Sequence, residues 1–148
     1  MKFDQFQNRV DHFFDSPRHA DEKIDVRQMN PVILAFIGDA YFNLFIRMRL
    51  LDFERSSVRV LNEISNEIVS AKFQARAVEK IKSQLTDEEI DIIRRGRNAK
   101  THSPKTSTIE EYHLSTGFEA LIGSLYLENR IERLDEICEI SFQSLIGE

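Results

Sequence analysis

The sequence predicts an all-α protein with a single domain over residues 1–148. A chain of this length is typical of one domain and is long enough to bury a substantial core. Five glycines and three prolines interrupt it, so long stretches run without a helix breaker. Alternation of apolar and polar residues, the pattern of a half-buried strand, is almost absent, whereas apolar residues recur at the spacing of helices.

The N-terminal segment 2–14 is expected to form a short amphipathic helix, which the pair Ser16-Pro17 ends. The polar residues from there to Gln28 are expected to form a loop or a weak helical turn. One face of the helix bears apolar side chains that we expect to be buried: Phe3, Phe6, Val10, Phe13 and Phe14.

The central helix is expected to run from Asn30-Pro31 to about Leu51. Asn30 can cap it, and proline at the first helical position lacks only an N–H that would have no partner there. The segment 32–46 is the most apolar run in the chain and contains one formal charge, Asp39. Helical spacing predicts a core stripe formed by Leu34, Ile37, Tyr41, Leu44, Phe45 and Met48.

The same helix has more large apolar surface than one core stripe needs. Surplus apolar surface of this kind usually marks an interface. We therefore expect an isologous two-fold homodimer with this helix near the axis. The residues that supply the surplus are Phe36, Tyr41, Phe42 and Phe45.

The remaining helices follow from periodicity and capping signals. A helix from Ser56 or Ser57 is expected to continue to about Ile81. The run from Thr86 to Glu89 has the pattern of a capping box and predicts a helix that ends near Gly96. Two more helices are expected over about 109–128 and 131–145, after a polar loop at 97–108.

Charge is concentrated in one segment of this acidic chain. The net charge is −5, yet segment 94–105 contains five basic residues and no acid. A basic segment on an acidic body can direct a polyanion to one place. A solvated connector is the alternative, but long polar loops in compact domains are usually functional or disordered.

Several kinds of site and location are disfavoured. Cys138 is the one cysteine, so no internal disulfide forms, and its helical context favours a reduced core residue over a nucleophile. There is no clustered His/Cys set and no glycine-rich phosphate loop. Arg47 and Arg49 close the longest apolar run before it reaches membrane-spanning length, and no signal-peptide core begins the chain. We expect a cytoplasmic protein.

Two acids interrupt apolar helical runs beside small residues. Asp39 follows Gly38, and Glu119 lies among Gly117, Ala120 and Gly123. Small residues let two helices cross closely, which could bring the two carboxylates together. Such a pair favours Mg²⁺, with Mn²⁺ as a substitute, and beside a basic loop it suits phosphodiester hydrolysis. The alternatives are that Asp39 lies at the solvent-facing edge of a buried helix, or that the bundle has no catalytic function.

Five strings resemble one known family. They are IGDA (37–40), VSAK with Gln74-Ala75 (69–75), RGRNAK (95–100), Pro104-Lys105 and STGFEALIGSLYLE (115–128). Together, over about residues 30–128, they resemble the Mini-III ribonucleases, bacterial ribonuclease III enzymes with a catalytic domain and no double-stranded-RNA-binding domain. The resemblance implies the all-helical ribonuclease III catalytic fold, an obligate homodimer and Mg²⁺-dependent cleavage of double-stranded RNA.

The resemblance also implies a biological role. It implies maturation of the ends of 23S ribosomal RNA, stimulated by ribosomal protein L3, with products that have 5′-phosphate and 3′-hydroxyl ends. Two other hypotheses remain open. One is an RNase III-like module that binds structured RNA with weak or no catalysis, and the other is a helical protein–protein adaptor.

Residue by residue, the resemblance assigns two acids as catalytic residues and metal ligands. Asp39 matches the aspartate of the GDA motif, and Glu119 matches the glutamate of the FEA motif. Longer RNase III enzymes have further acids at three positions where this chain has Val32, Ala35 and Thr116. Mini-III members also lack these acids. Water and phosphate oxygens would complete the coordination of Mg²⁺. Asn43 replaces a glutamate that is frequent one turn after the GDA motif.

RNA binding is assigned to the basic segment. A-form RNA is recognised mainly by shape, through contacts with phosphates and 2′-hydroxyls, which arginine, lysine and asparagine can make. The residues expected to bind are Arg94, Arg95, Arg97, Asn98, Lys100 and Lys105. Lys72, in the VSAK string, is a weaker candidate, for which a solvated surface lysine is the alternative.

Overall fold

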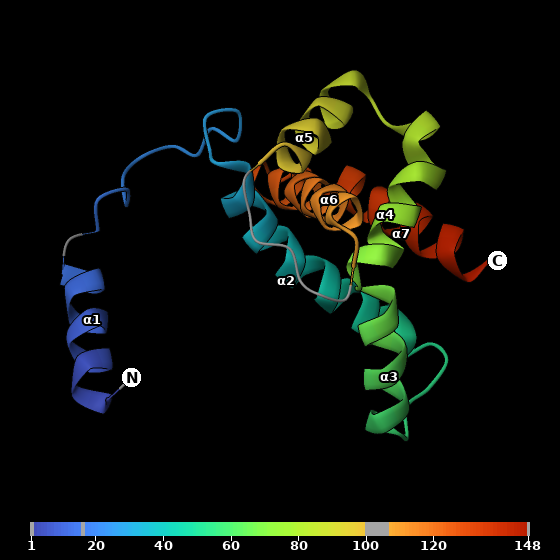
Figure 1. Cartoon of the computed structure of the whole chain (residues 1–148), viewed down its shortest axis with the longest axis horizontal. Coiled ribbons are helices and arrows are strands. Elements are labelled where there is room, and N and C mark those ends of the chain that lie inside the picture. The colour runs from blue at the N-terminus through green and yellow to red at the C-terminus, as the bar shows by residue number, and fades with distance from the viewer. Residues whose placement is uncertain (1, 16, 100–106, 148) are drawn as a thin grey trace.

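The computed structural model describes residues 2–15, 17–99 and 107–147. Over these residues the protein is helical and contains no strand, which confirms the all-α prediction (Figure 1). The elements are α1 (Phe3–Asp15), α2 (Pro31–Leu50), α3 (Val58–Ile68), α4 (Ala71–Ile81), the 3₁₀ turn η1 (Lys82–Gln84), α5 (Asp87–Arg97), α6 (Ile109–Leu127) and α7 (Ile131–Ile146).

Helix starts follow local capping chemistry. The side chain of Asn30 accepts a hydrogen bond from the backbone N–H of Val32 at 2.9 Å, and Pro31 occupies the first turn of α2. Thr86 and Thr108 begin α5 and α6 with capping boxes in which a glutamate three residues later completes the pair of hydrogen bonds. These starts agree with the sequence prediction.

One predicted helix is two helices in the structure. The segment expected to be continuous up to Ile81 is broken at Val69 and Ser70. The side chain of Ser70 accepts a hydrogen bond from the backbone N–H of Phe73 and begins α4 as its N-cap. A serine hydroxyl competes with the helical ladder for backbone donors, and here it starts a new helix.

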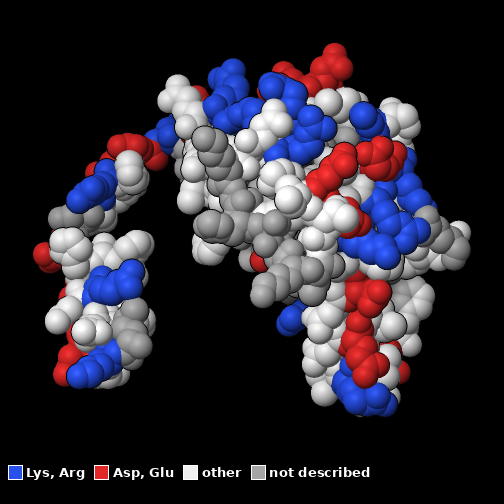
Figure 2. Space-filling model, viewed as in Figure 1, with Lys and Arg blue, Asp and Glu red and all other residues white. Residues whose placement is uncertain are grey.

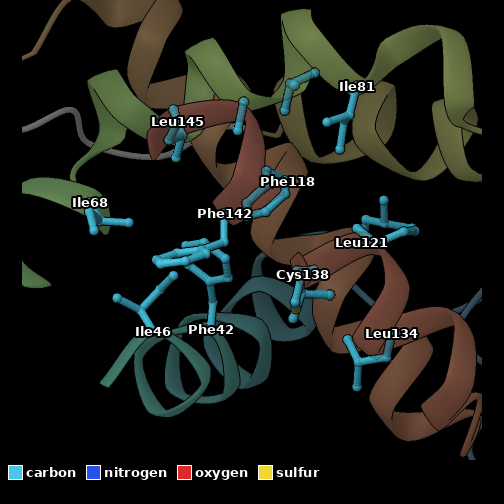
Figure 3. Packing of buried hydrophobic residues seen from close by; sticks show 14 of the residues in the cluster. Phe42, Ile46, Ile68, Ile81, Phe118, Leu121, Leu134, Cys138, Phe142 and Leu145 are labelled. Atoms are coloured by element: carbon cyan, nitrogen blue, oxygen red, sulfur yellow. The ribbon is translucent and has the colours of Figure 1, made fainter. Parts of the chain in front are cut away.

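Helix α6 is the centre of the fold. It packs against α2, α4, α5 and α7, and most of its residues are buried. Figure 3 shows Phe42 of α2, Phe118 of α6 and Phe142 of α7 close together in the main core. The rings of Phe42 and Phe118 meet edge to face with centroids 5.0 Å apart. Cys138 is buried in the same cluster, as expected for a core residue.

The face of α2 that enters the core differs from the predicted stripe. Leu44 and Met48 are each 59% exposed, so their placement in the core was wrong. The buried face is formed by Leu34, Ala35, Gly38, Phe42, Ile46 and Leu50. Phe42 was expected to supply surplus surface at an interface, and that was wrong, because it is fully buried in the core. This helix is apolar all round, so periodicity could not select the core face. The core face of α2 is set instead by the close contact between Gly38 and the backbone of α6.

By length and composition alone, α2 is apolar enough to cross a membrane. Arg47 and Arg49 therefore do not exclude a span by that criterion, contrary to the sequence argument. The core helix of a soluble protein meets the same criterion, and α2 makes its most extensive packing contact with α6.

Helix α1 does not pack on the rest of the described chain. Its apolar face was expected to be buried, but none of its residues is buried. Figure 1 shows α1 on the far side of residues 17–29, apart from the body that α2 to α7 form. The periodicity correctly indicated an amphipathic helix, but it could not supply the partner for that face. A single domain over residues 1–148 stays a prediction.

A buried ion pair fixes α5 relative to α7. Glu89, 1% exposed, accepts hydrogen bonds from Nε and Nη2 of Arg133 at 2.8 and 2.7 Å. Burial by itself would raise the pKa of Glu89, but hydrogen bonds from Arg133 and Thr86 outweigh it and hold that pKa below its usual value. The N-terminus of α5 is thereby held in place.

Candidate active site

Helices α2 and α6 touch through their backbones at two glycines. A Cβ atom on Gly38 would lie 1.7 Å from the backbone oxygen of Glu119. A Cβ atom on Gly123 would lie 1.9 Å from the backbone oxygen of Leu34. No other residue fits at either position without moving a helix, so the close approach inferred from Gly38 is present in the structure.

A second glycine pair joins α5 to α6. A Cβ atom on Gly96 would lie 2.6 Å from Cα of Gly117, and one on Gly117 would lie 2.3 Å from the backbone oxygen of Ile93. Gly117 therefore serves the crossing with α5 rather than the crossing with α2 that its sequence position suggested. The C-terminal end of α5 lies against α6 two residues before Glu119.

The two candidate ligands meet beside the first crossing. Asp39 is exposed, at the solvent-facing edge that the alternative interpretation described, whereas Glu119 is half-buried. Burial raises the pKa of Glu119 from 4.5 to about 9, and a hydrogen bond to Asp39 and repulsion by its charge add to the rise. In the metal-free protein Glu119 therefore holds a proton at neutral pH.

Asn43 holds Asp39 in place. Its Nδ2 donates hydrogen bonds to the backbone oxygen of Asp39 at 2.8 Å and to Oδ1 of Asp39 at 3.0 Å. The sequence placed Asn43 on the same helix face as Asp39 and marked it as a departure from the family pattern, but it did not assign it this role. The signal for its role was its spacing of four residues from Asp39, which places both side chains on one helix face.

Two of the three positions at which longer enzymes have further acids are closed to solvent, whereas Val32 is half-buried. Ala35 and Thr116 are buried, and the hydroxyl of Thr116 donates to the backbone oxygen of Tyr112 at 3.1 Å. Among the described residues no group of three or more His, Cys, Asp or Glu side chains could hold a metal.

The donor chemistry nevertheless fits a hard divalent cation. Asp39 and Glu119 offer carboxyl oxygens only, and their side chains are close enough to form a hydrogen bond with each other. Mg²⁺ is commonly bound by one or two carboxylates together with waters and phosphate oxygens. The residues present would hold such an ion as a partial ligand set that the substrate completes.

The predicted RNA-binding residues that the structure describes have different surroundings. Arg94, Arg97 and Asn98 are exposed at the C-terminal end of α5, and Arg94 is ion-paired with Asp91. Arg95 is half-buried and its Nη2 donates to the backbone oxygen of Met29 at 2.9 Å. Arg95 therefore anchors the segment before α2, a structural role that the sequence did not reveal.

The other predicted RNA-binding residues lie elsewhere. Lys72 is exposed in the first turn of α4. Hydrogen bonds from Thr108 lower the pKa of Glu111, and the nearby charge of Lys72 lowers it further. Lys72 thus lies near the N-terminus of α6. Lys100 and Lys105 lie outside the described residues.

A groove of about 200 Å³ connects this basic end of α5 with α4 and α6. Its rim includes Lys82, Arg94 and Arg97, with Glu79 as the opposing acid. Figure 2 shows basic and acidic side chains intermingled over the visible face of the body rather than one uniform basic field. Lys82 lies far from segment 94–105 along the chain, so the sequence did not place it near that segment.

Comparison with known proteins decides the family. The Ribonuclease III domain model matches residues 33–130. The chain belongs to the ribonuclease III family. Within it, the chain is 43% identical to Mini-ribonuclease 3 of Thermoanaerobacter sp. over 122 residues, which are 82% of this chain and 86% of that protein. It is 41% identical to Mini-ribonuclease 3 of Staphylococcus aureus over 115 residues, 76% of this chain and 86% of that protein.

A solved structure supports the ribonuclease III fold. A crystal structure of a Fusobacterium nucleatum protein superposes with a TM-score of 0.72 and 35% identity, covering 80% of this chain and 96% of that one. The Mini-III resemblance, the fold and an endoribonuclease of the ribonuclease III type are therefore confirmed. The roles of individual site residues stay predictions.

Proposed function

We propose that this ribonuclease III family member cleaves double-stranded RNA and uses a divalent metal ion to do so. The ion is principally Mg²⁺, and Asp39 and Glu119 hold it. The observation that supports this best is the hydrogen-bonded contact between the carboxyl groups of Asp39 and Glu119 where α2 and α6 touch. A helical bundle gains nothing in stability from two acids placed side by side, because one must give up its charge. Their juxtaposition makes sense as a cation site.

Different residues of this chain have different roles at the proposed metal site. Asn43 keeps Oδ1 of Asp39 oriented, and Glu119 must release its proton before its carboxylate can become a ligand. When bound, the ion neutralises phosphate charge and makes a water molecule more acidic. Arg94 and Arg97 lie at the end of α5 that contacts α6 near Glu119, where they would hold the RNA backbone by its phosphates.

The proposal includes a two-fold dimer that forms through the outer face of α2. Phe36 is 74% exposed, and Ile33, Leu44 and Met48 share its face of the helix. These side chains are placed almost symmetrically about Ala40, which is small and exposed. A two-fold axis perpendicular to α2 at Ala40 would pair Phe36 with Leu44 of the partner subunit and give an isologous apolar interface. Two such sites would serve the two strands of a duplex.

The finer assignments rest on kinship with the Mini-ribonuclease 3 proteins and on the strings quoted above. We propose a cytoplasmic enzyme that matures the ends of 23S ribosomal RNA, with ribosomal protein L3 as a stimulating partner.

One incubation tests the activity. The protein is mixed with long double-stranded RNA and Mg²⁺, with EDTA and single-stranded RNA as controls, and with Asp39→Asn protein as a matched control. Cleavage of the duplex only, lost with EDTA and in the variant, supports the proposal. RNA retention without cleavage would indicate a binding module. The absence of both cleavage and RNA retention would indicate a protein–protein adaptor. Sedimentation of wild-type protein as a stable monomer at micromolar concentration would refute the dimer.

A further inference from the structure

Helix α1 presents an apolar face that nothing in the described chain covers. Its phenylalanines are between 52 and 75% exposed: Phe3, Phe6, Phe13 and Phe14. Isolated helices shorter than about 12–15 residues are marginal in water, so a helix of this length needs packing to persist. Figure 2 shows that side chains of α1 do not bridge the space between it and the body. The described residues therefore supply no partner for this face.

The polar face of α1 restricts what that partner can be. It contains Asp4, Asp11 and Asp15 against a single Arg9 within Phe3–Asp15. Helices that lie on membranes are usually rich in lysine and arginine, because lipid surfaces are commonly anionic. An acidic helix with an aromatic stripe instead fits a protein surface that is apolar and flanked by basic residues.

Such a surface exists at the opposite end of the body. A groove of about 190 Å³ lies between the end of α2 and α3, and its apolar lining includes Met48, Leu51, Val58 and Leu61. Val58, the first residue of α3, is 72% exposed. Arg47 lines the groove. Arg55 donates to the backbone oxygen of Leu51 in its lining at 2.7 Å, and Arg59, next to Val58 on α3, is paired with Glu63.

The connection between α1 and the body is barely long enough to bring α1 to the groove of its own chain. Val26 is buried and Arg95 holds the backbone oxygen of Met29, so the chain is fixed to the body from about there. Residues 16–25 span at most about 35 Å when extended, and hydrogen-bonded turns at 17–22 shorten that reach. The groove lies past the far end of α2, a helix about 30 Å long. Figure 1 shows α1 and α3 on opposite sides of the body.

A second copy brings the groove to the helix. In the dimer proposed above, a two-fold axis at Ala40 makes the two α2 helices antiparallel. The N-terminal end of α2, where the connection to α1 is fixed, then lies beside the C-terminal end of α2 in the partner. We infer that α1 is an exchanged arm, whose phenylalanine face docks in the groove between α2 and α3 of the partner subunit. This inference rests on the proposed dimer.

Cross-linking between two distinguishable chains tests the exchange. One chain has Gln7→Cys, at the edge of the apolar face of α1, and the other, of different tagged length, has Asn62→Cys, in the groove. After the two proteins are mixed and allowed to exchange subunits, a short bis-maleimide is added. Cys138 is buried, and a wild-type mixture measures its background. We expect a covalent product containing one chain of each length.

The other results overturn the inference. A chain bearing both cysteines that cross-links only within itself would show that α1 docks on its own body. No cross-link in a protein that still sediments as a dimer and cleaves double-stranded RNA would remove the arm and leave the proposed function intact. Flotation of wild-type protein with phosphatidylglycerol vesicles, lost when Phe6 and Phe13 are replaced by serine, would assign α1 to a membrane instead.

A matched pair of variants measures the strength of the contact. The variant Phe6→Ser with Phe13→Ser should raise the dimer dissociation constant at least tenfold, because each subunit loses two apolar anchors. The control, Gln5→Ser with Asn8→Ser, makes the same number of changes on the polar face and should change that constant less than twofold. Equal dissociation constants for the two variants would overturn the docking of α1.

Discussion

Replacing Glu119 by glutamine separates the metal role of this residue from its role in folding. In the metal-free protein, the protonated carboxyl of Glu119 is hydrogen-bonded to Asp39. A glutamine amide has nearly the same shape and can donate the same hydrogen bond without an ionisable proton. We therefore expect the variant to lose cleavage activity and metal binding while the metal-free fold becomes more stable.

The size of the gain follows from the pKa of Glu119. An unfolded glutamate loses its proton near pH 4.5, whereas folded Glu119 keeps it to about 9. Between these values the unfolded state binds fewer protons, so wild-type stability falls as the pH rises. At about pH 7.5 this amounts to about 4 kcal/mol at 1.36 kcal/mol for each pKa unit. Because Glu119 is only half-buried, solvent screening reduces the expected gain to about 2 kcal/mol.

Urea denaturation in EDTA at about pH 5 and about pH 8 measures the effect. The free energy of unfolding of Glu119→Gln should match wild type near pH 5 and exceed it by about 2 kcal/mol near pH 8. Glu110→Gln, an exposed glutamate on the same helix, is the control and should show no such growth with pH. A variant that is less stable than wild type near pH 8, or a gain equal at both pH values, would refute the reasoning.

The same experiment with metal tests the ligand role. A ligand that binds only the folded state raises the free energy of unfolding as its concentration increases. Millimolar Mg²⁺ should therefore stabilise wild-type protein near pH 8 and leave Glu119→Gln unchanged. If the variant is stabilised as much as wild type, Glu119 is not a ligand of the ion.

Three further changes have defined outcomes. Asn43→Ala removes the donor that orients Asp39 and should weaken Mn²⁺ binding by about tenfold in calorimetry, whereas Asn43→Gln should restore part of it. Glu89→Gln should lower the free energy of unfolding by about 2 kcal/mol at neutral pH. Because Arg133 lowers the pKa of Glu89, this loss should become smaller as the pH falls below the usual glutamate pKa. Replacing Arg97, Lys100 and Lys105 together by alanine should weaken RNA binding. The slope of log affinity against log salt concentration should become shallower by about 0.7–0.9 for each lost phosphate contact, and Lys72→Ala serves as a single-site comparison.

The features that sequence predicted correctly depend on neighbouring residues. The starts of α2, α5 and α6 follow from Asn30, Thr86 and Thr108, whose side chains cap backbone groups two or three residues away. The break at Ser70 has the same local chemistry and was missed because apolar spacing continues across it. A helix cap can be predicted from the sequence when the apolar pattern stops at the cap, and it is missed when the pattern continues across it.

The features that sequence missed depend on partners distant along the chain. Leu44 and Met48 fit a helical stripe as well as the residues that are buried, because α2 is apolar all round. Arg95 reads as one basic residue among several, yet its hydrogen bond to Met29 crosses from α5 to the segment before α2. The raised pKa of Glu119 likewise comes from burial by the packed helices and, in addition, from Asp39, which lies on another helix.

The two glycine crossings on α6 connect the fold to the chemistry. The contact of Gly38 with α6 brings α2 close enough for Asp39 to hydrogen-bond with Glu119. The contact of Gly96 with Gly117 brings the arginines of α5 to the stretch of α6 just before Glu119. A side chain at any of these glycines would push a helix outward and change the distance between groups that must act together. The small residues that permit close packing therefore also set the geometry of the site, which explains why the acids lie beside them in the sequence.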